Sequence, residues 1–180
     1  MAQHYCDAAV GDPLHGPYHD QEYGFPIADD NALFNRLILE INQAGLSWAT
    51  ILKKKKNFFA AYTSFDIAKV AAYDEEARAR LLNDAGIIRN RLKVNAAIVN
   101  AGRIIEIQAE QGSFKAWLDH HHPAELADWV KLFRTNFKFT GPEIVREFLV
   151  SSGYLPDAHR QDCPTFAVIK RLNPPWMHKP

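Results

Sequence analysis

The chain has only two cysteines, which lie near its opposite ends, and each has a histidine close to it in sequence. His19 follows Cys6, and His159 precedes Cys163 by four residues, a spacing that lets both side chains reach one metal ion. Two thiolates and two imidazoles complete the tetrahedral ligand set of a structural zinc site. Such a site would hold two loop-rich termini in place, where apolar burial alone would leave them frayed.

On spacing alone, other interpretations of these residues stay open. Two cysteines can simply be buried thiols, and the six other histidines are rival donors: His4, His15, His120–His122 and His178. A third interpretation is the open catalytic zinc site of a hydrolase, built from His19, His159 and the histidine run. That site needs a vacant coordination position and a nearby general base, whereas two cysteines and two histidines fill a tetrahedron.

Glu40 is a carboxylate placed beside an apolar row. It follows Leu33 by seven residues, so on a helix it lies next to the Leu33–Leu37 face that we expect to be buried. Burying an unpaired carboxylate is costly, so such a group must find hydrogen-bond donors or a cation. Periodicity by itself favours a glutamate at the surface edge of this stripe.

Aromatic side chains and a flexible turn lie near Glu40 in sequence. Tyr18 and Tyr23 precede it, and the Gly45–Trp48 turn follows it at the junction of two predicted helices. Each aromatic residue on its own would be interpreted as core. Together they offer π faces, one acceptor and a protruding apolar residue, which is what an enzyme needs to hold a base drawn out of a duplex.

The elements that must position these groups are predicted to be helical, because apolar residues recur at helical spacing. We expect Asp30 to cap a helix that Gly45 ends, and Ser47 to cap the next helix, with Lys53–Lys56 facing solvent. Gly86 is predicted as a left-handed C-cap, and Gly112 closes a long helix. The remaining helices are expected over 66–70, 75–84, 90–112, 114–119, 125–135 and 142–152, with irregular structure over 1–28 and from Tyr154 onward.

Length and composition indicate one domain spanning 1–180. The chain is 47% hydrophobic and 12% aromatic, which is enough for a packed interior. It has no apolar run of about 18 residues and no secretory signal at its N-terminus, so we expect a cytoplasmic protein without a membrane segment. The formal net charge of +0 argues mildly against a nucleic-acid binder, although basic residues can still gather on one face.

Four sequence blocks occur in order between the two cysteines: PYHDQEYGFP, LFNRLILEINQAGLSWATILKKK, DAGIIRNRLKVNAAIVNA and NFKFTG. With these blocks, nearly the whole chain resembles the 3-methyladenine DNA glycosylase I family. The resemblance implies an all-α helix-hairpin-helix fold whose hairpin, Asp84–Ile88, lies between two helices near residues 80–100. It also implies that Cys6, His19, His159 and Cys163 ligate a structural Zn²⁺.

The resemblance assigns a role to each candidate site residue. Glu40 would recognise the damaged base and act as the catalytic residue, with Tyr18 and Trp48 as stacking walls and Tyr23 beside them. Gly45 and Leu46 would fill the gap left in the duplex, and Gly86 would present backbone amides to a phosphate. The basic residues implied next to this hairpin are Arg89 and Lys93.

The implied reaction is the hydrolytic removal of 3-methyladenine from alkylated double-stranded DNA. The enzyme would flip the base, release free 3-methyladenine and leave an abasic site, because no lysine nucleophile is evident. An adenine alkylated at N3 is cationic, so aromatic faces and an ionised Glu40 would favour it over normal adenine. A monomer is expected.

Three positions depart from the family pattern. Ala8 stands where a tryptophan is usual, His15 replaces a tyrosine, and Tyr23 replaces a tryptophan. Losing a large aromatic wall would loosen the pocket or shift the preferred lesion. The alternative function is therefore a catalytically silent or altered-specificity protein on the same fold, which binds damaged DNA or a nucleobase without releasing a base.

Overall fold

The computed structural model describes residues 4–178 and, along this length, contains helices and no β-strand. The α-helices in chain order are α1 (Tyr5–Ala9), α2 (His15–Gln21), α3 (Asp30–Gln43), α4 (Trp48–Ala61), α5 (Ile67–Ala71), α6 (Glu75–Asn83), α7 (Arg91–Gln111), α8 (Phe114–His121), α9 (Leu126–Asn136), α10 (Pro142–Ser151) and α11 (Pro164–Arg171). Two short 3₁₀ helices are η1 (Thr63–Phe65) and η2 (Pro175–Met177). The all-α prediction is confirmed. Within this part of the chain, no helix is long and apolar enough to cross a membrane.

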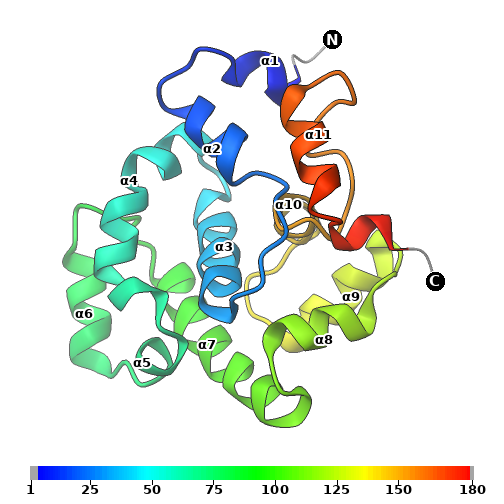
Figure 1. The fold of residues 1–180 in the computed structure, drawn as a ribbon. Coiled ribbons are helices and arrows are strands. Elements are labelled where there is room, and N and C mark those ends of the chain that lie inside the picture. The colour runs from blue at the N-terminus through cyan, green and yellow to red at the C-terminus, as the bar shows by residue number, and fades with distance from the viewer. Residues whose placement is uncertain (1–3, 179–180) are drawn as a thin grey trace.

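Helix α3 lies at the centre of the molecule (Figure 1), where it packs against α4, α5, α7, α8 and α10. Leu33, Leu37 and Ile41 are fully buried along it. A helix enclosed on several sides buries residues around most of its circumference. This explains why Glu40 lies inside the protein rather than at the edge of an apolar stripe.

The start of α3 lies one residue earlier than predicted. Its N-cap is Asp29, whose side chain accepts a hydrogen bond of 2.8 Å from the amide of Ala32. Asp30 instead accepts hydrogen bonds from the amides of Phe114 at 2.8 Å and Lys115 at 2.9 Å, at the start of α8. A carboxylate is favourable at a helix N-terminus, so each of two adjacent aspartates serves a different helix.

Helix α4 begins as predicted, with the Ser47 hydroxyl accepting a 3.3 Å hydrogen bond from the amide of Thr50. The prediction that the whole lysine run faces solvent is wrong for two residues. Lys54 donates to the carbonyl oxygen of Ala85 at 2.9 Å, and Lys55 forms an ion pair with Glu22. The run therefore joins α4 to two distant segments of the chain.

The turn between α6 and α7 contains Gly86, which does not cap α6 in the left-handed conformation. The C-cap is Asp84, with an extended backbone. Glycine is favoured at position 86 because there is little room for a side chain. A Cβ there would lie 2.9 Å from Asp84 Oδ1 and 3.2 Å from Asn57 Cβ. At the far end of α7, Gly112 has φ +87° and closes the helix as predicted.

Both termini contain helices where irregular structure was predicted. Helices α1 and α2 lie within the first 28 residues, and α11 and η2 follow Tyr154. The prolines that suggested loops stand in first turns: Pro17 in α2, Pro164 in α11 and Pro175 in η2. A first-turn N–H has no intrahelical acceptor, so proline is tolerated there. Helix α1 and the start of α11 lie at the same end of the molecule (Figure 1), where Cys6 of α1 is close to Cys163, the N-cap of α11.

Candidate functional site

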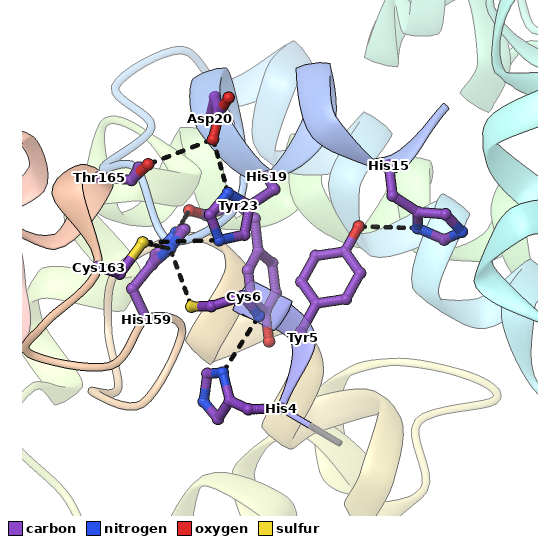
Figure 2. Close-up of polar contacts among 10 residues, drawn as sticks. All are labelled: His4, Tyr5, Cys6, His15, His19, Asp20, Tyr23, His159, Cys163 and Thr165. Carbon is purple, nitrogen blue, oxygen red and sulfur yellow. Dashed lines mark hydrogen bonds and ion pairs between the residues drawn. The ribbon is translucent and has the colours of Figure 1, made fainter. Parts of the chain in front are cut away.

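The two cysteines and their two histidines meet in one buried cluster (Figure 2). The ligating atoms of Cys6, His19, His159 and Cys163 all lie within 4.8 Å of one another. Cys163 Sγ lies 3.8 Å from His19 Nε2 and 3.6 Å from His159 Nδ1, and Cys6 Sγ lies 3.8 Å from His159 Nδ1. Neither cysteine forms a disulfide.

This donor set fits a tetrahedral metal ion. With ordinary Zn–S and Zn–N bond lengths, a tetrahedron places sulfur and nitrogen ligands about 3.6 Å apart, close to the three distances above. Burial raises the pKa of the Cys6 thiol and lowers the pKa of the His159 imidazole, so both groups favour their neutral forms without a counter-charge. A divalent cation would supply that charge to the thiolates.

Each histidine of the cluster is oriented by a hydrogen bond from its other ring nitrogen (Figure 2). His19 Nδ1 lies 2.7 Å from Asp20 Oδ1, which also accepts a 3.3 Å hydrogen bond from the Thr165 hydroxyl. His159 Nε2 lies 2.7 Å from the carbonyl oxygen of Tyr23. Such outer partners fix the tautomer and aim the free nitrogen at a metal.

A pocket of about 230 Å³ lies beside this cluster. Its lining comes from α1, α2, α3, α4 and α10 and from the segment after α2. Aromatic and acidic side chains dominate this lining: Tyr5, Tyr18, Tyr23, Glu40, Gln43, Trp48 and Glu147. Four of the seven were predicted to hold a base, namely Tyr18, Tyr23, Glu40 and Trp48, and the fold brings all four together.

Glu40 is a buried carboxyl group, 4% exposed. Its Oε1 accepts a 3.3 Å hydrogen bond from the Ser151 hydroxyl on α10. The pKa of Glu40 is raised to about 8: burial raises it most, the charge of Arg36 opposes this rise, the charge of Glu147 adds to it, and the Ser151 hydrogen bond lowers it. In the empty pocket, Glu40 is therefore largely protonated near neutral pH.

Arg36 forms hydrogen bonds both to Tyr18, which lines the pocket, and to α10. Its Nη1 donates to the Tyr18 hydroxyl at 3.1 Å and to the carbonyl oxygen of Ser151 at 3.0 Å, and its guanidinium lies 5.1 Å from the centre of the Tyr18 ring. Nη2 lies 3.5 Å from Glu22. Burial raises the pKa of the Tyr18 hydroxyl well above its usual value, so that hydroxyl stays neutral.

The aromatic rings of the pocket contact one another at tilted and edge-on angles. The Tyr18 ring centre lies 5.1 Å from that of Trp48 and 5.7 Å from that of Tyr23. The Tyr5 ring centre lies 5.3 Å from that of Tyr23. These rings supply several π faces to one small volume.

Sequence reasoning missed three lining residues: Tyr5, Gln43 and Glu147. Tyr5 supplies an aromatic wall from α1. Ala8, where a gap in the pocket was expected, is exposed and outside the lining. His15 also lies outside the lining, but its Nδ1 is 3.0 Å from the Tyr5 hydroxyl (Figure 2). The only available signal for Tyr5 was its place next to a metal-ligand candidate.

The residues expected to contact DNA lie in two places. Gly45, with φ +78°, and the partly exposed Leu46 follow α3 at the edge of the pocket. Arg89 is exposed beside the α6–α7 turn, but the amide of Gly86 already donates a 2.7 Å hydrogen bond to Asp84 Oδ1. Lys93 is not a free surface cation: it is 5% exposed, and its ammonium group donates to the carbonyl oxygens of Asn42 and Ala44.

Comparison with known proteins gives one consistent result. A family model described as methyladenine glycosylase matches residues 8–128. DNA-3-methyladenine glycosylase 1 of Escherichia coli (strain K12) is 36% identical over 171 residues, covering 84% of this chain and 91% of the relative.

Solved structures agree. That of 3-methyladenine DNA glycosylase I from Staphylococcus aureus has a TM-score of 0.81 at 33% identity, covering 89% of this chain and 95% of the other. A variant of 3-methyladenine DNA glycosylase I in complex with 3-methyladenine has a TM-score of 0.80 at 32% identity, covering 89% and 96%. By sequence and by fold, the chain belongs to the methyladenine glycosylase family and is therefore a DNA glycosylase.

Proposed function

We propose that this protein hydrolyses the bond between 3-methyladenine and its sugar in alkylated double-stranded DNA. The observation that carries this proposal is a buried carboxyl group, Glu40, inside a pocket with four aromatic side chains. The names of the relatives support 3-methyladenine as the base that is removed, and one solved relative is in complex with 3-methyladenine.

Selection of the damaged base rests on its charge. A purine alkylated at N3 is cationic while it is attached to the sugar, and aromatic faces attract a cation by about 0.5–2 kcal/mol per contact. A cation in the pocket also favours the ionised form of Glu40, which can then form charge-assisted hydrogen bonds to the base. Normal adenine gains neither interaction, so binding favours the lesion.

The chemical step requires little acid catalysis, because a cationic base is already a good leaving group. Pocket residues would hold the flipped base while positive charge develops on the sugar and water attacks. None of the residues that line the pocket, within the described part of the chain, is a lysine. This supports a monofunctional hydrolase that releases the base and leaves an abasic site.

Contact with the duplex would come from two segments. The Gly45–Leu46 loop at the pocket edge would fill the space left by the flipped base. The α6–α7 segment would act as a helix-hairpin-helix, with amides near Gly86 and the exposed Arg89 facing phosphate. One such face is used per duplex, so we propose that the protein acts as a monomer.

A zinc ion held by Cys6, His19, His159 and Cys163 would have a structural role. Four protein ligands leave no coordination position for water or substrate, so the ion would supply no chemistry to the base. Tyr5 and Tyr18 stand next in sequence to Cys6 and His19. The ligands would therefore hold two walls of the pocket in position.

The experiment that tests this function is base release from methylated duplex DNA, measured with wild-type protein and with Glu40→Gln. We expect wild-type protein to release 3-methyladenine, and the variant to lose most of that activity while its affinity for undamaged duplex stays within about 3-fold. Equal losses of activity and of DNA affinity would contradict the role of Glu40. A folded wild-type protein that binds methylated DNA and releases no base would favour the silent binding protein.

A further inference from the structure

Glu147 is a second acidic group in the pocket, and it comes from a different element than Glu40. It lies on α10 four residues before Ser151, whose hydroxyl donates to Glu40. Residues four apart on a helix share one face. Glu147 therefore belongs to the face of α10 that packs against α3, and it lines the same pocket as Glu40.

The carboxylate of Glu147 has unused capacity to accept hydrogen bonds. It forms an ion pair with Arg146 through Oε1, and among residues 4–178 the one hydrogen bond to Oε2 is a long one, 3.4 Å, from the Tyr23 hydroxyl. A carboxylate has about four acceptor positions. Because its side chain is 34% exposed, Glu147 keeps water contact in the empty pocket and loses it when a ligand covers this wall.

The charge of Glu147 affects the protonation of neighbouring groups in the pocket. The negative charge of Glu147 contributes to the raised pKa of Glu40 and to the raised pKa of the Tyr23 hydroxyl. Arg36 on α3 and Arg146 on α10 offset part of this negative charge. A ligand that brings its own positive charge offsets the cost of ionising Glu40 next to the negative charge of Glu147.

We propose that Glu147 is a second recognition carboxylate, which together with Glu40 selects a flipped purine that is positively charged and presents hydrogen-bond donors toward both α3 and α10. This inference rests on the proposed function and adds a specificity-determining residue to it: the charge of Glu147 would strengthen the preference for an alkylated purine cation over a neutral purine. A neutral purine with the same exocyclic amine brings no positive charge to offset the carboxylate that it covers, so Glu147 would lose water contact without gaining an ionic partner, which is costly.

The selectivity can be measured with two small molecules that share one ring system. The 3,9-dimethyladeninium cation mimics the damaged nucleoside, with a methyl group in place of the sugar, and 9-methyladenine is its neutral counterpart. Titration calorimetry of the full chain gives a dissociation constant for each. Glu147→Gln keeps the size of the side chain and removes its charge, and Glu143→Gln does the same at an exposed position of the same helix.

We expect Glu147→Gln to weaken binding of the cation by about 10- to 100-fold and to change binding of 9-methyladenine by less than about 3-fold. Glu143→Gln is expected to change neither. Arg146→Gln removes the competing cation and is expected to tighten binding of the dimethyladeninium. Thermal melting of each variant shows whether it is folded, and Arg146→Gln tests the same idea in the opposite direction if Glu147→Gln does not fold.

Three results would overturn the inference: equal effects of Glu147→Gln on both molecules, a weaker cation affinity in Arg146→Gln, or wild-type protein that binds neither molecule. The proposed function can be rejected independently of this inference. Wild-type protein that prefers the cation in this Glu147-dependent way but releases no 3-methyladenine from methylated DNA would keep the inference and reject the glycosylase activity. Release of 3-methyladenine together with no effect of Glu147→Gln on cation binding would keep the glycosylase activity and reject the role of Glu147.

Discussion

The ammonium group of Lys93 donates a 2.7 Å hydrogen bond to the carbonyl oxygen of Ala44, the residue directly before Gly45. A second hydrogen bond of 2.9 Å reaches the carbonyl oxygen of Asn42. A lysine on α7 therefore supplies donors to the carbonyl groups at the C-terminal end of α3, which have no partner within that helix. It fixes the start of the loop that carries Leu46.

Replacing this lysine is expected to act on folding rather than on phosphate binding. Lys93→Met should lower the free energy of unfolding by roughly 1–3 kcal/mol, because the buried carbonyl group of Asn42 and the partly buried one of Ala44 lose a charged donor. The salt dependence of DNA binding should stay unchanged. The exposed Arg89 is the matched comparison: Arg89→Gln should reduce the slope of log affinity against log salt by about 0.9 for one lost phosphate contact. A reduced slope in Lys93→Met would contradict this assignment.

The protonation of Glu40 gives the folded protein a characteristic dependence on pH. Its pKa is raised from 4.5 to about 8, so between these values the folded state keeps a proton that the unfolded chain has lost. Stability should therefore fall as pH rises through this window. Glu40→Gln should remove that slope and be roughly 2–4 kcal/mol more stable than wild type at alkaline pH. Urea denaturation at a series of pH values measures this, and parallel curves for the two proteins would contradict it.

Binding of a cationic base should show the opposite trend. A cation favours ionised Glu40, so the dissociation constant of 3,9-dimethyladeninium should decrease by up to about tenfold per pH unit until pH reaches about 8, the pKa of Glu40. Glu40→Gln should flatten the profile. The charged or titratable groups around Glu40 are Arg36, Tyr18, Tyr23 and Glu147. A pH profile that is the same in Glu40→Gln would show that Glu40 does not control the binding of the cation.

Removal of metal should unfold the termini rather than stop chemistry directly. We expect the purified protein to contain one zinc per chain, and chelation to lower its melting temperature together with base release. Cys163→Ser should lose the metal, whereas the exposed His120→Gln should keep it. Loss of activity with an unchanged melting temperature after chelation would instead support a catalytic metal.

The aromatic wall formed by Tyr5 should contribute to affinity for cations. Tyr5→Ala is expected to weaken binding of 3,9-dimethyladeninium by about 3- to 30-fold, the effect of one lost cation–π contact. Tyr5→Phe keeps the ring and loses only the contact to His15 Nδ1 at 3.0 Å, so its affinity should stay within about 3-fold of wild type. Similar losses in both variants would point to the hydroxyl rather than the ring.

The parts of the fold that follow local rules were predictable from sequence. Ser47 stands at the N-cap of α4, and Gly112 closes α7, both as predicted. The errors arose where one residue type fits two roles. Asp29 and Asp30 are equally good caps, and only the distant start of α8 decides between them. Proline-rich termini suggested loops because sequence alone does not tell a proline inside a first turn from a proline that breaks a helix.

Site residues were predictable only where a single stretch of sequence contains a recognisable motif. Glu40 and Trp48 flank a recognisable turn, and the resemblance to a known family named them. Tyr5 and Glu147 reach the pocket because α1 and α10 pack beside it, and neither short-range spacing nor composition reports such packing. Lys93 looked like a surface cation for the same reason, since its acceptors lie on another helix.

The cluster that joins the chain ends also sets the order in which the protein can mature during synthesis. Cys6 and His19 are synthesised well before their two partners, since His159 follows Cys6 by 153 residues and Cys163 follows His19 by 144 residues. Until then α1, and with it Tyr5, has no anchor on α11. A growing chain therefore contains the residues of the central helices before it contains those that fix α1, and a chain that ended before Cys163 would lack one member of the cluster that positions Tyr5.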